Sequence, residues 1–185
     1  MVMSLPPEQP VARFLDVLAA LESERRWFQG VSALRFAAVS ALCCPGSADD
    51  VAQGIRRTAD ALHEASSWLG PFRSDMRFIV GAMLLLHGQD PEALIEEIKS
   101  VQALFRKAGL RRGGTYEAMA ALLLWLGKEG QAVVDEDVAR FQEIYEQMKK
   151  YQWWLTGPDD FPACAVLTGQ AEDPVVIGER IESIY

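Results

Sequence analysis

Four glycines recur at nearly equal intervals along the chain, and this spacing constrains the fold more than any other feature of the sequence. Gly46, Gly88, Gly127 and Gly169 are separated by 42, 39 and 42 residues. Each glycine follows a compact apolar block and precedes polar residues, after which apolar residues fall at helical spacing. The repeated unit is therefore predicted to be a short apolar helix, a glycine turn and a longer two-faced helix.

The helical pattern extends over most of the chain and predicts an all-α fold of about nine helices. No stretch shows the sustained alternation that is typical of a strand. Because helix pairs bury their apolar faces by stacking, we expect a short α-solenoid, capped by a helix at about residues 11–28. One domain is expected over residues 1–185, with a flexible N-terminus at 1–9 and repeat units at about 29–67, 68–109, 110–152 and 153–185.

Short polar motifs predict where several helices begin. Asp90 and Asp173 each precede a proline, which combines a capping carboxylate with a residue suited to the first helical turn. Ser47 and Asp50 have the spacing of a capping box. Thr115 is expected to be the N-cap of a short helix, because it directly precedes an apolar block.

Composition and charge exclude several classes of protein. The chain is 50% hydrophobic and 24% charged, as ordinary globular proteins are, and its net charge of −8 arises after residue 112. An acidic chain without a basic stripe lacks the charge pattern that binds nucleic acid. Its apolar runs are shorter than the ~20 residues that span a bilayer. We therefore expect no nucleic-acid partner and no membrane segment.

Three cysteines, two of them adjacent in an apolar run, have neither disulfide nor zinc spacing. This predicts a reducing, cytoplasmic location. His63 and His87 lie 24 residues apart in different predicted elements, so no metal site is expected. The sequence contains none of the common phosphate-binding or nucleophile motifs, and we expect no cofactor.

The segments that join the predicted units carry a second pattern. They read SSWLGPFR at 66–73, KAGLRRGGTYEAMAALLLW at 107–125, EIYEQMKKYQWWLTGPDDFPACAVL at 143–167 and IESIY at 181–185. This series resembles an uncharacterised bacterial family, catalogued as domain of unknown function number four thousand and three. The resemblance covers roughly residues 27–185 and is most specific at 143–167.

The resemblance implies an all-helical cytoplasmic protein without an assigned activity. Relatives are often longer, with further helices past the position of Tyr185, so the last helix here is expected to expose a face that they cover. The chain departs from the family pattern at Phe161, where tyrosine is usual, and at Trp153, near a family histidine.

The joining segments also contain the best candidates for a ligand site. Asp159 and Asp160 are adjacent carboxylates that can cap the helix starting near Pro162 or hold a divalent cation, and Thr156 can add a hydroxyl to either role. The pattern favours capping. Arg73 follows Phe72 at the corresponding place two units earlier, where it could form an ion pair with either aspartate.

Aromatic and basic residues at these places allow two interpretations. Trp153 and Trp154 are adjacent, so they cannot both face one core, and the pattern favours a plug between units over an exposed binding site. Arg35 and Arg77 precede phenylalanines at matching positions, which favours a packing role in the repeat.

These observations favour a non-enzymatic helical-repeat protein that binds a protein or peptide partner, or a second copy of itself as a homodimer. The acidic C-terminal part predicts a basic or amphipathic partner. The alternative is an enzyme or a small-ligand or divalent-cation-binding protein, with a site formed by Phe72, Arg73, Thr156, Asp159 and Asp160.

Overall fold

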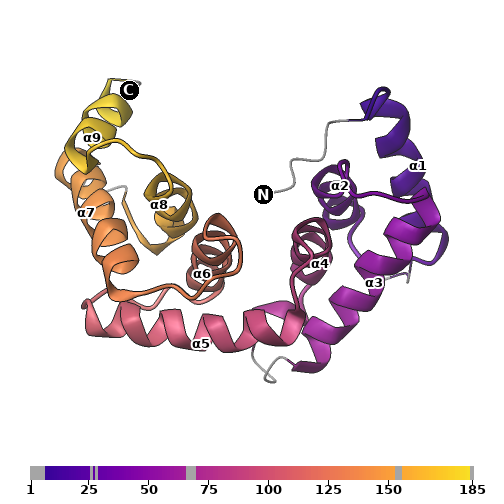
Figure 1. Ribbon diagram of the computed structural model, residues 1–185, viewed down its shortest axis with the longest axis horizontal. Coiled ribbons are helices and arrows are strands. Elements are labelled where there is room, and N and C mark those ends of the chain that lie inside the picture. The colour runs from indigo at the N-terminus through magenta and orange to yellow at the C-terminus, as the bar shows by residue number, and fades with distance from the viewer. Residues whose placement is uncertain (1–6, 26, 28, 66–69, 153–155, 184–185) are drawn as a thin grey trace. The chain divides into compact units, whose positions relative to one another are not determined.

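The computed structural model describes residues 7–25, 27, 29–65, 70–152 and 156–183 (Figure 1). This part of the chain contains nine α-helices and two 3-10 turns but no strand, which confirms the predicted all-α class. The helices are α1 (Pro10–Ser23), α2 (Val31–Ser40), α3 (Ala48–Ala65), α4 (Met76–His87), α5 (Pro91–Lys107), α6 (Thr115–Gly127), α7 (Asp135–Gln152), α8 (Phe161–Thr168) and α9 (Pro174–Glu182). The 3-10 turns are η1 (Pro71–Arg73) and η2 (Pro158–Asp160).

The chain divides into two compact units, Met1–Ile95 and Glu96–Tyr185, and the boundary falls inside α5. The apolar helices α4 and α6, of 12 and 13 residues, alternate with the longer amphipathic helices α3, α5 and α7, of 17 or 18 residues. Among the short helices, α6 buries eight of its 13 residues. A helix that is apolar on nearly all sides needs neighbours on several sides, and this requirement explains the packing in each unit.

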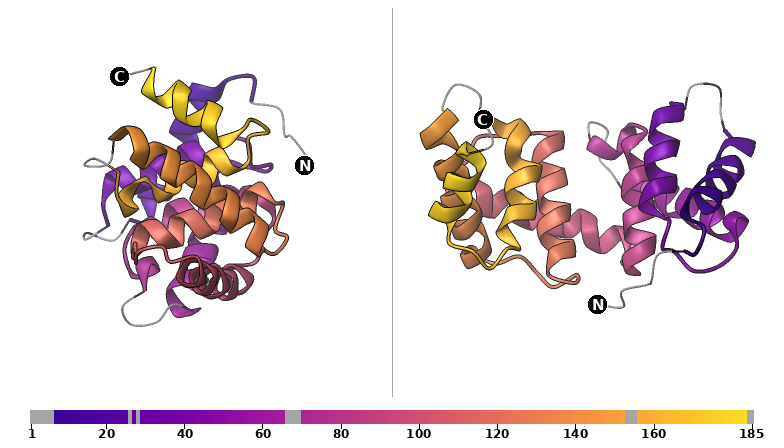
Figure 2. Two further views of the ribbon diagram at one scale, coloured as in Figure 1. Left: turned by 90° about the vertical axis from the view of Figure 1, so that its left-hand side faces the viewer. Right: turned by 90° about the horizontal axis from the view of Figure 1, so that it is seen from above.

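In unit 1, α2 and α4 lie side by side, α3 packs on α4, and α1 contacts both α2 and α3 (Figures 1 and 2). The backbones of α3 and α4 approach each other closely at Gly81 of α4. A Cβ atom there would lie 3.1 Å from the carbonyl oxygen of Ile55 and 3.2 Å from the amide nitrogen of Ala59, both on α3. The missing side chain therefore lets the two helix backbones come together.

In unit 2, α6 and α8 lie side by side, and α7 packs on both α8 and α9 (Figure 1). Aromatic rings from three helices meet in its core. The ring of Phe105 stacks on that of Phe141 with centroids 4.8 Å apart, and Phe161 meets both rings edge-on, at 5.8 and 5.5 Å. Tyr145 adds a fourth ring, 5.2 Å from Phe161. These contacts join α5, α7 and α8.

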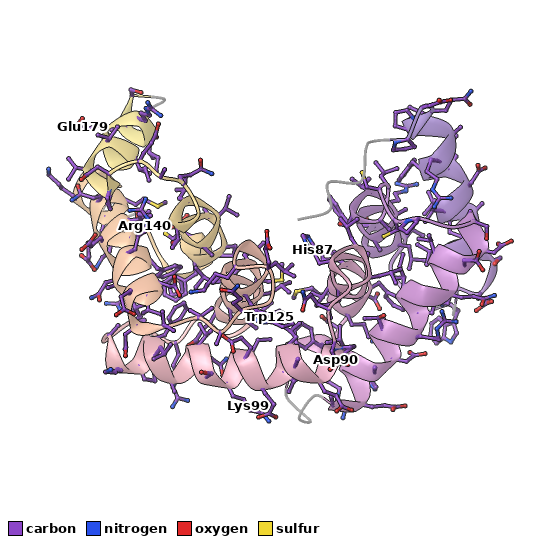
Figure 3. All side chains as sticks on the ribbon, in the orientation of Figure 1. His87, Asp90, Lys99, Trp125, Arg140 and Glu179 are labelled. Carbon is purple, nitrogen blue, oxygen red and sulfur yellow. The ribbon has the colours of Figure 1, made fainter. Side chains whose placement is uncertain are left out.

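Arg140 of α7 holds the segment between α8 and α9 (Figure 3). Its Nε donates to the carbonyl oxygen of Thr168 at 3.0 Å, and its Nη2 donates to the carbonyl oxygens of Gln170 and Glu172. The last carbonyl groups of a helix have no partner within the helix itself. The guanidinium therefore satisfies acceptors that the end of α8 leaves open.

Three of the predicted helix starts are confirmed and one is wrong. Asp90 accepts hydrogen bonds at 2.9 Å from the amides of the second and third residues after it, and Asp173 caps α9 by accepting the amide of Val175 at 2.8 Å. Ser47 and Asp50 form the reciprocal bonds of a capping box. Thr115 is instead the first residue of α6, whose N-cap is Gly114 without a capping side chain.

The glycine turns vary from unit to unit. Gly88 ends α4 in the left-handed conformation, with φ of +62°. Gly127 is still helical, and the turn after α6 instead passes through Gly130, with φ of +84°. The first helix, expected at about residues 11–28, ends at Ser23. The repeated glycines therefore do not occupy equivalent positions at the ends of the helices.

Candidate functional site

The predicted site residues are divided between the two units. Phe72 and Arg73 belong to unit 1, whereas Thr156, Asp159 and Asp160 belong to unit 2. Trp153 and Trp154 lie outside the described residues. We call residues 70–78 the first joint, and residues 109–117 together with 156–161 the second joint. Each joint is described within its own unit.

The first joint contains η1 and the first turn of α4. Phe72 is buried and anchors η1, which contacts both α3 and α4. Arg73 projects outward, and its Nη1 lies 3.2 Å from Nε2 of His63 on α3. The other ring nitrogen of His63, Nδ1, is buried without a hydrogen-bond partner among the described residues. Basic groups from two elements thus gather at this joint.

Arg77 is the buried charge of the first joint, with only 8% of its surface exposed. Its Nη1 lies 3.4 Å from the carbonyl oxygens of Arg73 and Ser74, at the outer limit for a hydrogen bond. Its guanidinium carbon lies 4.8 Å from the centre of the Phe78 ring. Arg35, which the sequence matched to Arg77, is exposed, so the two arginines have different surroundings.

Asp75, in the same joint, connects the starts of two helices. Its carboxylate accepts a hydrogen bond at 2.6 Å from the amide of Gly30, the N-cap of α2. A carboxylate at this place faces the positive end of the α2 dipole. The carboxylate nearest in sequence to Arg77 is therefore bonded to the α2 backbone.

The second joint contains the buried charge of unit 2. Glu117, in the first turn of α6, is only 4% exposed and forms an ion pair with Nη2 of Arg106. Its second carboxylate oxygen accepts the amide of Gly113 at 3.1 Å. Arg106 also donates to the carbonyl oxygens of Gln102 and Arg111. Both ions of this pair are therefore supported by further hydrogen bonds.

The paired aspartates of the second joint have different surroundings. Asp160 accepts the amide of Gly157 at 3.0 Å, which closes the turn before α8, while Asp159 is exposed. Thr156 is half-buried at the start of the same turn. Among the described residues, no group of three or more His, Cys, Asp or Glu side chains could hold a metal ion.

Asp160 also lies close enough to two buried groups to affect their ionisation. Burial raises the pKa of the Cys164 thiol to about 12, and the negative charge of Asp160 adds to this effect. Burial likewise raises the pKa of Tyr145, while the positive charge of Arg111 opposes the shift. The Cys164 thiol therefore remains protonated at neutral pH and is a poor nucleophile.

Two of the four sequence segments behind the family resemblance, 107–125 and 143–167, meet at the second joint. The turn at 109–117 and the turn at 156–161 are brought together, because a Cβ atom on Gly113 would lie 3.2 Å from the Phe161 ring. The model for proteins of unknown function DUF4003 matches residues 19–185. The chain belongs to the DUF4003 family. No curated protein and no solved structure matches this DUF4003 chain.

Two shallow depressions open on the described surface of this DUF4003 protein. One lies on α3 near the end of α1, and Arg56 within it donates to the carbonyl oxygen of Leu21 and faces Glu24 at 3.5 Å. The other follows one face of α7, from Ala139 to Gln147. No helix in the described ranges has both the length and the apolar character needed to cross a membrane.

The two buried charges of the joints were not predicted as site residues from the sequence. Arg77 and Glu117 lie 40 residues apart, and each begins an apolar block, RFIVGAMLLL and EAMAALLLWL respectively. The signal that could have found them is a charged residue inside the first turn of a helix that is otherwise apolar all round.

Proposed function

We propose that this DUF4003 protein is a non-enzymatic protein-binding module. In this proposal its helix pairs are repeats of a short α-solenoid, and a protein, a peptide or a second copy of the chain binds the exposed apolar faces of α1 and α2. The observation that carries the proposal is the exposure of large apolar side chains on these two helices.

The exposed apolar residues form a stripe on each helix. Val11 and Leu15, on α1, are 71% and 55% exposed and lie one helical turn apart. Phe36 and Val39, on α2, are 63% and 51% exposed and are three residues apart. Residues at these spacings share a helix face. Clustered apolar exposure is more typical of an interaction surface than single exposed side chains are.

The repeat interpretation is supported by the packing inside each unit. The short helices lie side by side within each unit, α2 with α4 and α6 with α8, while α3 packs on α4 and α7 packs on α8. Stacked helix pairs of this kind bury the apolar faces that a single pair leaves open. Such repeats present extended surfaces to a partner.

The chemistry of the surface favours an amphipathic partner with basic residues. The apolar stripes need apolar side chains from the partner, while unit 1 has eight Lys and Arg residues against 11 Asp and Glu residues. Complementary charge mainly accelerates association and is screened by salt. We therefore expect binding that becomes slower, but is not abolished, at high ionic strength.

Substitution of Phe36→Glu tests the proposal. Sedimentation velocity first measures self-association of the wild-type chain, and crosslinked pull-downs from the native cell then identify other partners. We expect Phe36→Glu to abolish the association that the wild type shows. The control is Val166→Glu, at an exposed valine of α8 in the other unit. Association that is absent, or that both variants retain, would contradict the proposal.

The second candidate function is the binding of a small ligand at a joint. The observation that favours it is the buried charge of Arg77, which has no carboxylate partner among the described residues. The second joint offers less support, since the Asp160 carboxylate already accepts the Gly157 amide.

A further inference from the structure

We propose that Arg77 binds an oxyanion, the phosphoryl or carboxylate group of a small ligand, at the turn that begins α4. This site lies in the first joint and does not depend on the apolar stripes of α1 and α2. Four observations support it: the burial of the guanidinium, its incomplete hydrogen bonding, the absence of a carboxylate partner, and the contrast with Glu117.

The guanidinium of Arg77 is incompletely bonded. The residue is 92% buried, and its Nε has no hydrogen-bond partner among the described residues. In the described part of the chain, Nη1 alone has hydrogen-bond partners, at 3.4 Å from the carbonyl oxygens of Arg73 and Ser74. These contacts place the guanidinium over the turn that precedes α4. A buried donor without a partner is unfavourable, and for a charged group the penalty is larger.

The chain itself supplies no side-chain carboxylate to Arg77. None of the ion pairs within the described residues involves Arg77. Residues 1–6, 26, 28, 66–69, 153–155 and 184–185, which lie outside the described ranges, include no Asp or Glu. The positive charge therefore remains without a carboxylate partner in the protein alone.

Glu117 is the buried charge at the corresponding place in unit 2, and both of its carboxylate oxygens have hydrogen-bond partners. It also lies in the first turn of a short helix, but Arg106 and the amide of Gly113 bond both of its carboxylate oxygens. A negative charge there is favoured by the positive end of the helix dipole, whereas the positive charge of Arg77 is disfavoured. An anion bound at the start of α4 would compensate both the guanidinium and the dipole.

The remaining hydrogen-bonding edge of Arg77 suits an oxyanion. With Nη1 directed at two carbonyl groups, Nε and Nη2 have no hydrogen-bond partner among the described residues, and an oxyanion that reaches this buried edge would bond both. Carboxylate and phosphate groups accept two parallel hydrogen bonds from such an edge. The exposed guanidinium of Arg73, with His63 3.2 Å from it, adds positive charge to the approach.

Thermal unfolding in different salts tests the proposal. Sodium phosphate and sodium acetate represent the two ligand groups, and sodium chloride at equal ionic strength is the reference. We expect phosphate or acetate to raise the Tm of the wild type by about 3–6 °C at ten times its Kd. The salt that gives the larger rise distinguishes a phosphoryl from a carboxylate ligand.

Two variants test whether the rise in Tm depends on Arg77. Arg77→Met should lose the rise in Tm, while Arg35→Met, at an exposed arginine of α2, should retain it. If neither salt exceeds chloride with the wild type, the proposal is wrong. It is also wrong if Arg77→Met keeps the full rise.

A measurement on the wild-type chain covers the case in which Arg77→Met does not fold. The NMR signal of the Arg77 Nε–H group, assigned by its loss in Arg77→Lys, reports on this atom directly. We expect the signal to shift with saturation as phosphate or acetate is added. A signal that moves no more than it does in chloride would overturn the proposal.

Discussion

Arg77 and Glu117 each lie in the first turn of a short helix, but the groups that contact their charges are different. Glu117 has a guanidinium and a backbone amide, whereas Arg77 has two distant carbonyl oxygens and the face of the Phe78 ring. The interaction with the ring contributes about 2 kcal/mol for a desolvated cation, and it supplies no hydrogen bond to the guanidinium nitrogens. A buried ion is tolerated when its own hydrogen bonds are made, so the two residues should respond differently to substitution.

Removal of Arg106 should strongly destabilise unit 2. Arg106→Met leaves the carboxylate of Glu117 buried without its guanidinium, and we expect the free energy of unfolding to fall by about 3 kcal/mol. Urea denaturation measures this change. The control is Lys107→Met, which removes an exposed ion pair with Asp135 and should cost less than about 1 kcal/mol. Equal losses in the two variants would contradict this account of Glu117.

The buried thiols predict a loss of stability in alkali. Burial raises the pKa of Cys44 to about 11 and that of Cys164 to about 12, whereas an unfolded thiol titrates near ~8.5. Below the unfolded pKa both states keep the proton and the stabilisation is complete. Above it the unfolded state alone loses protons, so the free energy of unfolding falls as pH rises towards the folded pKa.

Cys164→Ala should make this fall shallower by up to about 1 kcal/mol per pH unit between pH 9 and 11. Urea denaturation at a series of pH values measures the slope. Cys43→Ala is the control, because Cys43 is only half-buried. An unchanged slope in Cys164→Ala would show that this thiol does not carry the effect.

For single residues, hydrogen bonds between neighbours in the chain could be predicted from the sequence, whereas the burial of a side chain could not. The roles of Asp90 and Asp173 follow from neighbours in the chain and could be read directly. The burial of Arg77 depends on how α3, η1 and α4 pack, which no local pattern contains. The partner of Asp75 is Gly30, 45 residues earlier, and it could not have been predicted from spacing.

At the scale of elements, the contact between α3 and α4 depends on Gly81. A methyl group there would lie 3.1 Å from a backbone oxygen of α3, so the helices must move apart. We expect Gly81→Ala to destabilise the protein by about 1–3 kcal/mol, although alanine favours helices. Thermal or urea denaturation measures the effect.

The same substitution at the end of α6 should have the opposite sign. Gly127 is helical, and a Cβ atom there would meet nothing within 4 Å. Gly127→Ala should therefore stabilise by about 0.4–1 kcal/mol, because it restricts the unfolded chain. If both variants changed stability in the same direction, the contact at Gly81 would not be the cause.

The amphipathic helices could be predicted from the sequence, because their apolar residues recur at the helical period along the chain. Leu94, Ile98, Val101 and Phe105 recur at helical spacing, and all four are buried. Val133 is buried and Val134 is exposed, and both precede the start of α7 at Asp135. The helical period does not apply before a helix begins, so the inward-facing residue there could not be predicted from spacing.

At the scale of the whole chain, the two compact units have separate cores. The rings of Phe105, Phe141, Phe161 and Tyr145 belong to unit 2 alone, whereas the side chains around Leu34 and Phe78 belong to unit 1. This division could not be predicted from the glycine spacing, because it depends on contacts between elements.

Phe161→Ala should therefore act on one unit. Loss of the ring from a fully buried site should cost about 3–5 kcal/mol of stability in unit 2. Hydrogen exchange followed by mass spectrometry should show weaker protection in α6 to α8 and unchanged protection in α2 to α4. Weaker protection throughout the chain would instead indicate that the units unfold together. Phe36→Ala, at an exposed ring, is the control and should change neither region.

The attachment of α9 differs from the other contacts in how it responds to salt. Arg140 reaches the segment before α9 through hydrogen bonds to neutral carbonyl oxygens. The neighbouring pair of Arg180 and Glu172 is instead an ion pair on the surface, where dissolved salt screens the attraction between the two charges. As salt is added, the segment between α8 and α9 should stay in place after the exposed ion pairs of unit 2 have been weakened.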